Sequence, residues 1–250
     1  MTRVLPPTTF HSSLLTRRLA ELDLLEGEEP AGDFAAELGQ WMHFTDAIAL
    51  SSVLESGMAP TTAQNPALRE AARAQVAAQF ERTTALMVSA ITRSCTGTGG
   101  NAAIKLPLVL DGEVSYLPYR QFYEAHQRDM EANVEPLRVN LRAALAKASP
   151  ELRKLAELDI VLGKILRERE GRMLARVPVL LKKRFDALYS GHQQQVAHGQ
   201  ADHPAAWTQA GGWLAQFLQN VHTLLLAEAD LRLQPSAGLL AALTQQHDHE

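Results

Sequence analysis

Two consecutive stretches decide the fold: PYRQFYEAHQRDMEANVEPLRVNLRAALAK at residues 118–147 and SPELRKLAELDIVLGKILREREGRMLARVPVLLKKRFDALY at residues 149–189. In the first, mostly apolar side chains recur at nearly every third or fourth position: Phe122, Tyr123, His126, Met130, Val134, Leu137, Leu141 and Leu145. The second repeats this spacing at Leu152, Leu155, Leu158, Leu162, Ile165 and Leu166, and again at Met173, Val177, Leu180, Leu181, Phe185 and Leu188. Such spacing places the side chains on one face of a helix, so two long amphipathic helices are predicted.

The two helices are expected to form a hairpin. Ser149 followed by Pro150 is a typical helix start, because serine caps free backbone N–H groups and proline suits the first helical position. A short turn at these residues would let the two helices pack antiparallel. Pro136 and Pro178 each remove a backbone hydrogen bond and should bend or divide their helices. The sequence therefore predicts a long kinked helical hairpin from residue 118 to about residue 199.

Shorter helices are predicted outside the hairpin, at residues 8–26, 33–56, 66–95 and about 205–233. Residues 96–117 are the least helical stretch: they open with the glycine cluster of residues 97–100 and turn at Asp111-Gly112, which favours a hairpin. A loop or short β-hairpin is expected there. The fold class is thus predicted to be all-α, a helical bundle in which this connector joins its two helical parts.

The predicted domain organisation follows from these elements. Residues 1–95 form an N-terminal helical part, 96–117 the connector, and 118–243 the long hairpin with the C-terminal helix. Residues 118–243 are expected to be one continuous domain, followed by a disordered tail at 244–250.

Composition excludes several classes of protein. The chain has 250 residues, of which 46% are apolar and 21% charged, values typical of a globular protein and not of a collagen-like or disordered one. A single cysteine, Cys95, rules out an internal disulfide and a cysteine-based zinc site, and is typical of a reducing compartment. No apolar run approaches the roughly 18 residues of a membrane-spanning helix. We therefore expect a cytoplasmic protein with no direct membrane insertion.

Charge is distributed unevenly along the chain, although the net charge is only −4. Residues 1–119 hold 8 basic and 13 acidic side chains, residues 120–186 hold 15 and 10, and residues 187–250 hold one and five. The middle third is therefore basic between two acidic thirds. Such asymmetry can steer a partner or can hold the thirds of one chain together.

The basic residues of the second long helix are a candidate interaction surface: Arg169, Arg172, Arg176, Lys182, Lys183 and Arg184. The first three lie three and four residues apart and so form a ridge on one helical face. Such a ridge could bind nucleic-acid phosphates, in which case binding would weaken steeply with salt. Glu168 and Glu170 interleave with it, which favours a protein partner or pairing within the chain over nucleic acid.

A pocket assembled from distant residues is the alternative hypothesis, that of an enzyme. Its candidate residues are Trp41, His43, Asp46, His126 and Arg128. His43 and Asp46 have the spacing of two metal ligands on one helical face, yet no paired ligand motif accompanies them, and Asp46 could cap a helix instead. A buried histidine bonded to a neighbouring group is the favoured interpretation of His126. No catalytic residue, metal or cofactor is predicted.

Three stretches together carry a family resemblance: WMHFTDAIAL at 41–50, YEAHQRDME at 123–131, and REGRMLARVP at 169–178, which leads into Arg184-Phe185. In this order they resemble the DUF3348-type family of uncharacterised proteobacterial proteins. The resemblance implies no activity, cofactor or catalytic residue. It does imply a gene context beside envelope proteins, one OmpA-like and another of coiled-coil or motor-stator character, and hence an accessory role in a membrane-associated assembly.

The function predicted from the sequence is that of a non-enzymatic interaction or scaffold protein with a protein partner. Long helices, segregated charge and the lack of a recognisable catalytic motif favour it. A homodimer through residues 150–190, paired like a coiled coil, is also expected, because so long a helix pair has more apolar face than one chain covers. An enzyme and a nucleic-acid-binding protein remain the alternatives.

Overall fold

The computed structural model describes residues 13–24, 42–55, 66–96, 104–106, 114–199 and 201–245. Every regular element within these ranges is an α-helix, which confirms the predicted all-α bundle. The helices are α1 (Leu14–Glu21), α3 (Phe44–Glu55), α4 (Pro66–Thr96), α5 (Leu117–Ala148), α6 (Pro150–Ala197), α7 (Pro204–Trp207) and α8 (Trp213–Gln245). In this part of the chain, no helix is apolar over a stretch long enough to cross a lipid bilayer.

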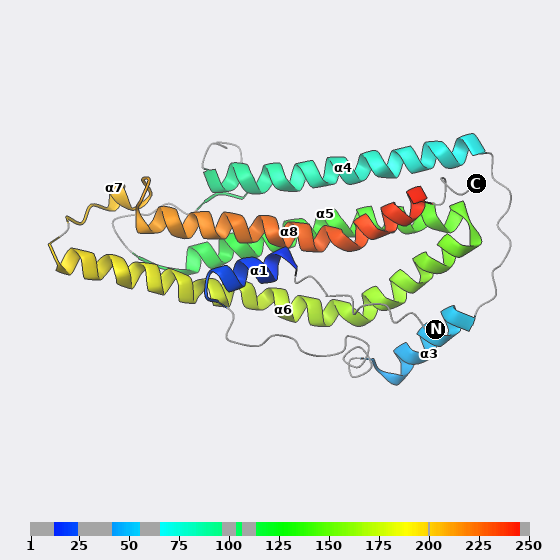
Figure 1. Ribbon diagram of the computed structural model, residues 1–250, viewed down its shortest axis with the longest axis horizontal. Coiled ribbons are helices and arrows are strands. Elements are labelled where there is room, and N and C mark those ends of the chain that lie inside the picture. The colour runs from blue at the N-terminus through cyan, green and yellow to red at the C-terminus, as the bar shows by residue number, and fades with distance from the viewer. Residues whose placement is uncertain are drawn as a thin grey trace, which may run out of the picture.

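Helices α5 and α6 form the predicted hairpin, with only Ser149 between them. The Ser149 hydroxyl accepts a hydrogen bond from the backbone N–H of Leu152 at 3.2 Å, so it caps α6 as expected. Pro136 and Pro178 lie inside continuous helices and do not end them. Figure 1 shows that α6 bends in the half that leads from α5, whereas the sequence predicts a bend at Pro178, in its second half.

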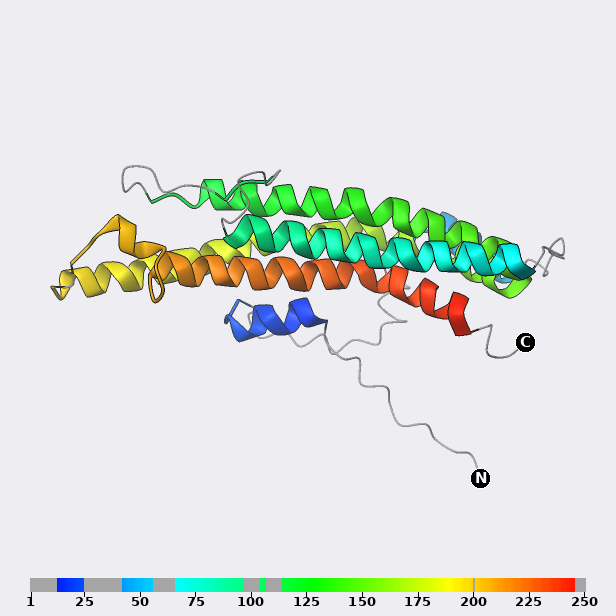
Figure 2. The same cartoon turned by 90° about the horizontal axis from the view of Figure 1, so that it is seen from above.

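Four long helices, α4, α5, α6 and α8, run along the long axis of the molecule and enclose its core (Figures 1 and 2). Helix α4 packs on α5 and α8, α1 packs on α8, and α3 packs on α6. The largest buried side chains come from all four long helices: Met87, Ile91, Tyr123, Met130, Leu137, Leu141, Leu145, Leu181, Leu214, Phe217, Leu224 and Leu225. Each large apolar side chain contributes about 1.5–3 kcal/mol when fully buried, so these stripes dominate stability.

An aromatic cluster joins the start of α5 and α8 to the second half of α6. Phe185 of α6 lies at its centre, with its ring centroid 5.0 Å from Phe217, 5.4 Å from Trp213 and 5.7 Å from Tyr119. Trp207 of α7 extends the cluster to Trp213 at 5.6 Å. Edge-to-face and tilted rings of this kind add about 0.5–1.5 kcal/mol per pair to their area burial.

The C-terminal helix differs from its prediction. A single helix was expected over about 205–233, but residues 208–212 separate α7 from α8, and α8 continues through Pro235 to Gln245. The break is fixed by glycine: Gly211 has φ +86°, and a Cβ on Gly212 would lie 2.2 Å from the carbonyl oxygen of Trp207. Only residues without a side chain fit this turn.

The other boundaries move as well. Of the helix predicted at 8–26, only residues 13–24 are described, and α1 spans Leu14–Glu21 within them. The helix predicted at 33–56 is described from residue 42, and α3 begins there at Phe44. Residues 104–106 and 114–116 form no regular element. The rest of the 96–117 connector, between Thr96 and Leu117, is outside the described ranges, so a β-hairpin there stays a prediction. Two residues of the predicted tail belong to α8, and 246–250 are not described.

Candidate functional site

The candidate interaction surface lies on α6, where the structure gives it a defined face. Helical geometry places Arg169, Arg172, Arg176 and Lys183 on the side opposite the buried residues Leu174, Val177, Leu181 and Phe185. We call this side, with Met173 and Val179 at its edges, the outer face of α6. Lys182 is exposed to one side of the outer face, whereas Arg184 is half-buried and donates to Asn220 of α8 at 3.2 Å. Arg184 therefore fixes α6 to the bundle.

The outer face begins in a stretch of α6 that has no buried residue. Residues 167–173 are all exposed, although they lie in the middle of a helix of 48 residues. Met173 is 64% exposed and Val179 is 56% exposed, so both offer apolar surface beside the arginines. A helical segment without a buried face is held mainly by its ends and by any partner that covers it.

Surface ion pairs reduce the positive charge of this region only in part. They join Arg167 to Glu135 at 3.4 Å, Arg172 to Glu168 at 2.6 Å and Lys182 to Asp186 at 2.5 Å. Both side chains of the Arg172–Glu168 pair are 74% exposed. Exposed pairs of this kind contribute about 0–1 kcal/mol and are readily exchanged for others. Arg172 can therefore exchange its pair with Glu168 for a pair with a partner.

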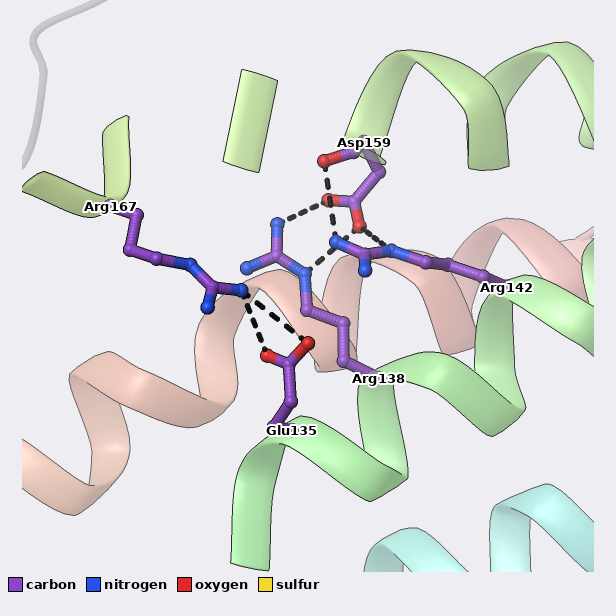
Figure 3. A network of polar contacts seen from close by, with 5 residues as sticks. All are labelled: Glu135, Arg138, Arg142, Asp159 and Arg167. Carbon is purple, nitrogen blue, oxygen red and sulfur yellow. Dashed lines mark hydrogen bonds and ion pairs between the residues drawn. The ribbon is translucent and has the colours of Figure 1, made fainter. Parts of the chain in front are cut away.

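Below the outer face, the first part of α6 is fixed to α5 by two arginines that share one carboxylate (Figure 3). Arg138 binds Asp159 through Nε at 2.9 Å and Nη2 at 2.6 Å, and Arg142 donates from Nε to the same carboxylate at 2.7 Å. Burial raises the pKa of Asp159, but the hydrogen bonds and charges of both arginines outweigh it and lower that pKa. The carboxylate is therefore charged at neutral pH. Gly163 leaves room for the guanidinium groups, since its Cβ would lie 3.1 Å from Arg138 Nη2.

The second part of α6 is held by a hydrogen bond that Pro178 makes necessary. Proline has no N–H, so the carbonyl of Leu174, four residues earlier, loses its usual helical partner. The side-chain amide of Gln127, on α5, donates to that Leu174 carbonyl at 3.0 Å. The phenol of Tyr116 donates to the carbonyl of Pro178 itself. Two residues near the start of α5 thus hold the proline region of α6.

The same Gln127 connects α6 to a buried carboxylate on α8. Glu228 is 0% exposed and accepts from Gln127 Nε2 at 3.0 and 3.1 Å, from Tyr123 Oη at 3.0 Å and from Arg232 Nε at 2.9 Å. Burial and the negative charge of Glu228 raise the pKa of Tyr123 well above its ordinary value, so the phenol remains a donor. With its donors in place and no exposed surface, Glu228 serves to hold three helices together and has no access to a substrate.

Sequence reasoning missed this buried network, although two signals point to it. Glu228 continues the apolar spacing of Phe217, Val221 and Leu224, so its carboxylate had to face the core. Pro178 indicated that the Leu174 carbonyl needed another donor. The donor itself, 47 residues away in sequence, had no signal of its own.

Among the pocket candidates, His43 and Asp46 lie at the start of α3. Asp46 accepts from the backbone N–H of His43 at 3.3 Å, so it closes the first turn from inside the helix and is not the capping residue. Helix α3 packs on α6, and Lys154 of α6 donates to the Leu54 carbonyl at 2.6 Å. Trp41 is outside the described residues.

The other two candidates, His126 and Arg128, lie on α5 and are placed differently. His126 is 1% exposed, and its Nε2 is 2.8 Å from the hydroxyl of Ser94 on α4. The Ser94 hydroxyl also lies 2.9 Å from the carbonyl oxygens of Ala90 and Ile91, so it connects His126 to the last turns of α4. Arg128 is exposed. The described contacts join His43 to Asp46 and His126 to Ser94, and none of them joins these two pairs.

Neither His126 nor Cys95 has the properties of a catalytic group. Burial lowers the pKa of His126 to about 4, against a smaller raising effect of Asp129, so the ring is neutral at pH 7. Burial also raises the pKa of Cys95 to about 12, against the hydrogen bond from Ser94, and a thiolate is the form needed for nucleophilic attack. Within the described part of the chain, no three histidine, cysteine, aspartate or glutamate side chains are grouped as metal ligands would be.

The fold and its contacts define an all-α bundle in which internal polar groups position helices, while Arg169, Arg172, Arg176 and Lys183 lie on an exposed face of α6. The chain belongs to the family described as Protein of unknown function (DUF3348), whose model matches residues 1–245. This confirms the family resemblance of the three quoted stretches. No curated protein and no solved structure matches the chain.

Proposed function

We propose that this protein is a non-enzymatic interaction protein and that it binds another protein through the outer face of α6. The observation that carries the proposal is the exposed stretch of residues 167–173, which ends at Met173, together with the exposed Val179 further along the outer face. Helix α6 is fixed to α5 on both sides of this stretch. Before it, Asp159 accepts from Arg138, and after it, the Leu174 carbonyl accepts from Gln127. The bundle thus presents a rigid, uncovered helical surface, which suits protein recognition.

The proposal extends to where the protein acts. The gene context implied by its family favours a partner in an envelope-associated assembly, with this chain as a cytoplasmic accessory to it. A fluorescent fusion tests this part. We expect signal at the cell periphery that becomes diffuse in a variant with Arg172 and Arg176 reversed to glutamate.

Binding of nucleic acid to the same surface is the less favoured function. Met173 and Val179 are exposed beside the arginines, and apolar side chains make no favourable contact with a phosphate backbone. A protein surface with both apolar and acidic groups fits these features better.

Site-specific photo-cross-linking tests the proposed function. A photoreactive amino acid at Met173 is expected to give a light-dependent adduct with another protein in cells that express the chain naturally. The matched control is Leu86 on α4, which is 61% exposed, close to the 64% of Met173, but lies away from α6. The proposal fails if Met173 gives no adduct beyond that of Leu86 and the protein purified from those cells has only its own mass by light scattering.

A further inference from the structure

The exposed charge of α6 indicates what kind of surface it can bind. Between residues 164 and 183, the exposed charged side chains comprise seven basic and two acidic residues: Lys164, Arg167, Glu168, Arg169, Glu170, Arg172, Arg176, Lys182 and Lys183. This excess is concentrated on one helix, although the whole chain has a net charge of −4. A partner that approaches this helix therefore gains if it carries carboxylates and loses if it carries cations.

The apolar side chains of the outer face give the partner a second feature. Met173 lies on one side of the Arg172–Arg176 row and Val179 lies on the other, and six residues of helix separate them along about 9 Å. Both are more than half exposed. A flexible methionine and a valine on either side of the row can each accept an apolar side chain from a helix that crosses α6.

We propose that the outer face of α6 binds an amphipathic helix of a different protein, one that carries a row of glutamates or aspartates with apolar residues beside it. The inference rests on the proposed function and goes further by naming the partner's chemistry. The apolar residues cover Met173 and Val179, and the partner's carboxylates pair with Arg169, Arg172 and Arg176. Binding exchanges weak exposed pairs, such as Arg172–Glu168, for pairs that are partly shielded from water.

A second copy of this chain fits the surface less well. Two outer faces brought together would place arginines and lysines of one chain against those of the other, and like charges across an interface cost several kcal/mol. The acidic residues of the region are Glu168 and Glu170, together with Glu135 and Asp186, which pair with Arg167 and Lys182; these four are too few to balance seven basic residues. Charge thus favours an acidic partner over self-association through this face.

Designed peptides provide the first test. One probe is a synthetic amphipathic helix with leucines on its apolar face and glutamates beside them, and its counterpart has lysine at each glutamate position. We expect the full-length protein to bind the glutamate peptide at least about tenfold more tightly than the lysine peptide in fluorescence anisotropy, with the difference shrinking at high salt.

Charge reversal localises that binding. In the variant Arg172→Glu/Arg176→Glu, the seven basic and two acidic residues become five and four, so the preference for the glutamate peptide is expected to disappear. The control variant Arg82→Glu/Arg93→Glu makes the same change in net charge on exposed residues of α4 and should keep the preference for glutamate. Equal effects of the two double variants, or equal affinity of the wild type for both peptides, would overturn the inference.

The natural partner gives the second test, and it separates this inference from the proposed function. The segment cross-linked to a photoreactive residue at Met173 should be a helix with a net negative charge. If that segment is neutral or basic, is a nucleic acid, or belongs to a second copy of this chain, the partner's chemistry has been inferred wrongly. If the segment belongs to another protein but is neutral or basic, the proposed function in protein binding still stands.

Discussion

The clearest energetic prediction concerns Gln127, whose one amide nitrogen serves two helices. The substitution Gln127→Met keeps the length and helix propensity of the side chain while removing its hydrogen bonds. The Leu174 carbonyl then has no donor, because Pro178 cannot supply one, and a buried unsatisfied group costs about 1–3 kcal/mol. Glu228 also loses one donor, and a hydrogen bond to a charged group is worth about 1.5–3 kcal/mol. We expect the free energy of unfolding to fall by about 3–5 kcal/mol.

A double-mutant cycle with Pro178→Ala isolates the part that depends on the proline. Alanine at position 178 restores an N–H that can bind the Leu174 carbonyl within α6. Gln127→Met should then cost about 1–2 kcal/mol less in this background than in the wild type. Equilibrium unfolding in urea, followed by circular dichroism for all four proteins, measures the difference.

The result that would refute the reasoning is additivity. If the two substitutions add to within about 0.5 kcal/mol, Gln127 does not replace the hydrogen bond that Pro178 removes. The variant Tyr123→Phe serves as a comparison, because it removes one donor from Glu228 and leaves the Leu174 carbonyl satisfied. Its cost should be the same whether residue 178 is proline or alanine.

Three further predictions test other parts of the structure. Gly212→Ala should destabilise the protein by at least about 2 kcal/mol, because its Cβ would lie 2.2 Å from a carbonyl oxygen. Gly171→Ala should instead stabilise α6 by about 0.5–1 kcal/mol, because a Cβ there would meet nothing within 4 Å. Thermal unfolding of the two variants measures the difference. Asp159→Asn leaves two half-buried arginines without their carboxylate and should cost about 2 kcal/mol in urea unfolding; a change below about 0.5 kcal/mol would contradict the network in Figure 3. Burial lowers the pKa of His126 from 6.5 to about 4, so between these pH values the folded state binds fewer protons than the unfolded state. The free energy of unfolding should therefore fall by about 3 kcal/mol as the pH drops from 6.5 to 4. The variant His126→Gln should lack this pH-dependent loss of stability. Identical pH profiles for the wild type and the variant would refute the assignment to His126.

Much of the fold could be predicted because its main signal is local. The spacing of Leu137, Leu141 and Leu145 predicts one helical face, and all three side chains are fully buried. Ser149 predicts the start of α6 from its capping chemistry alone. The break at Gly211 and Gly212 was missed, because the close approach of the Trp207 carbonyl is a property of the folded turn.

The candidate site was predictable only as far as the helix face. The 3.6-residue period places Arg169, Arg172 and Arg176 together, but it says nothing about which side of α6 the bundle covers. It also cannot distinguish Arg184, which donates to Asn220 of α8, from Lys183 one position before it. The proposed pocket residues show the same limit, since His126 faces Ser94 of α4 whereas His43 lies on a helix that packs on α6.

The sequence by itself therefore determined which segments are helical, where the long hairpin turns, and that α6 carries a basic row. It does so because helix propensity, capping and periodicity act over a few residues. Only the tertiary structure decided that Gln127, Tyr123 and Arg232 meet at Glu228, and that residues 167–173 remain uncovered. Those facts depend on how helices far apart in sequence pack against one another, and packing is set by all of their side chains together.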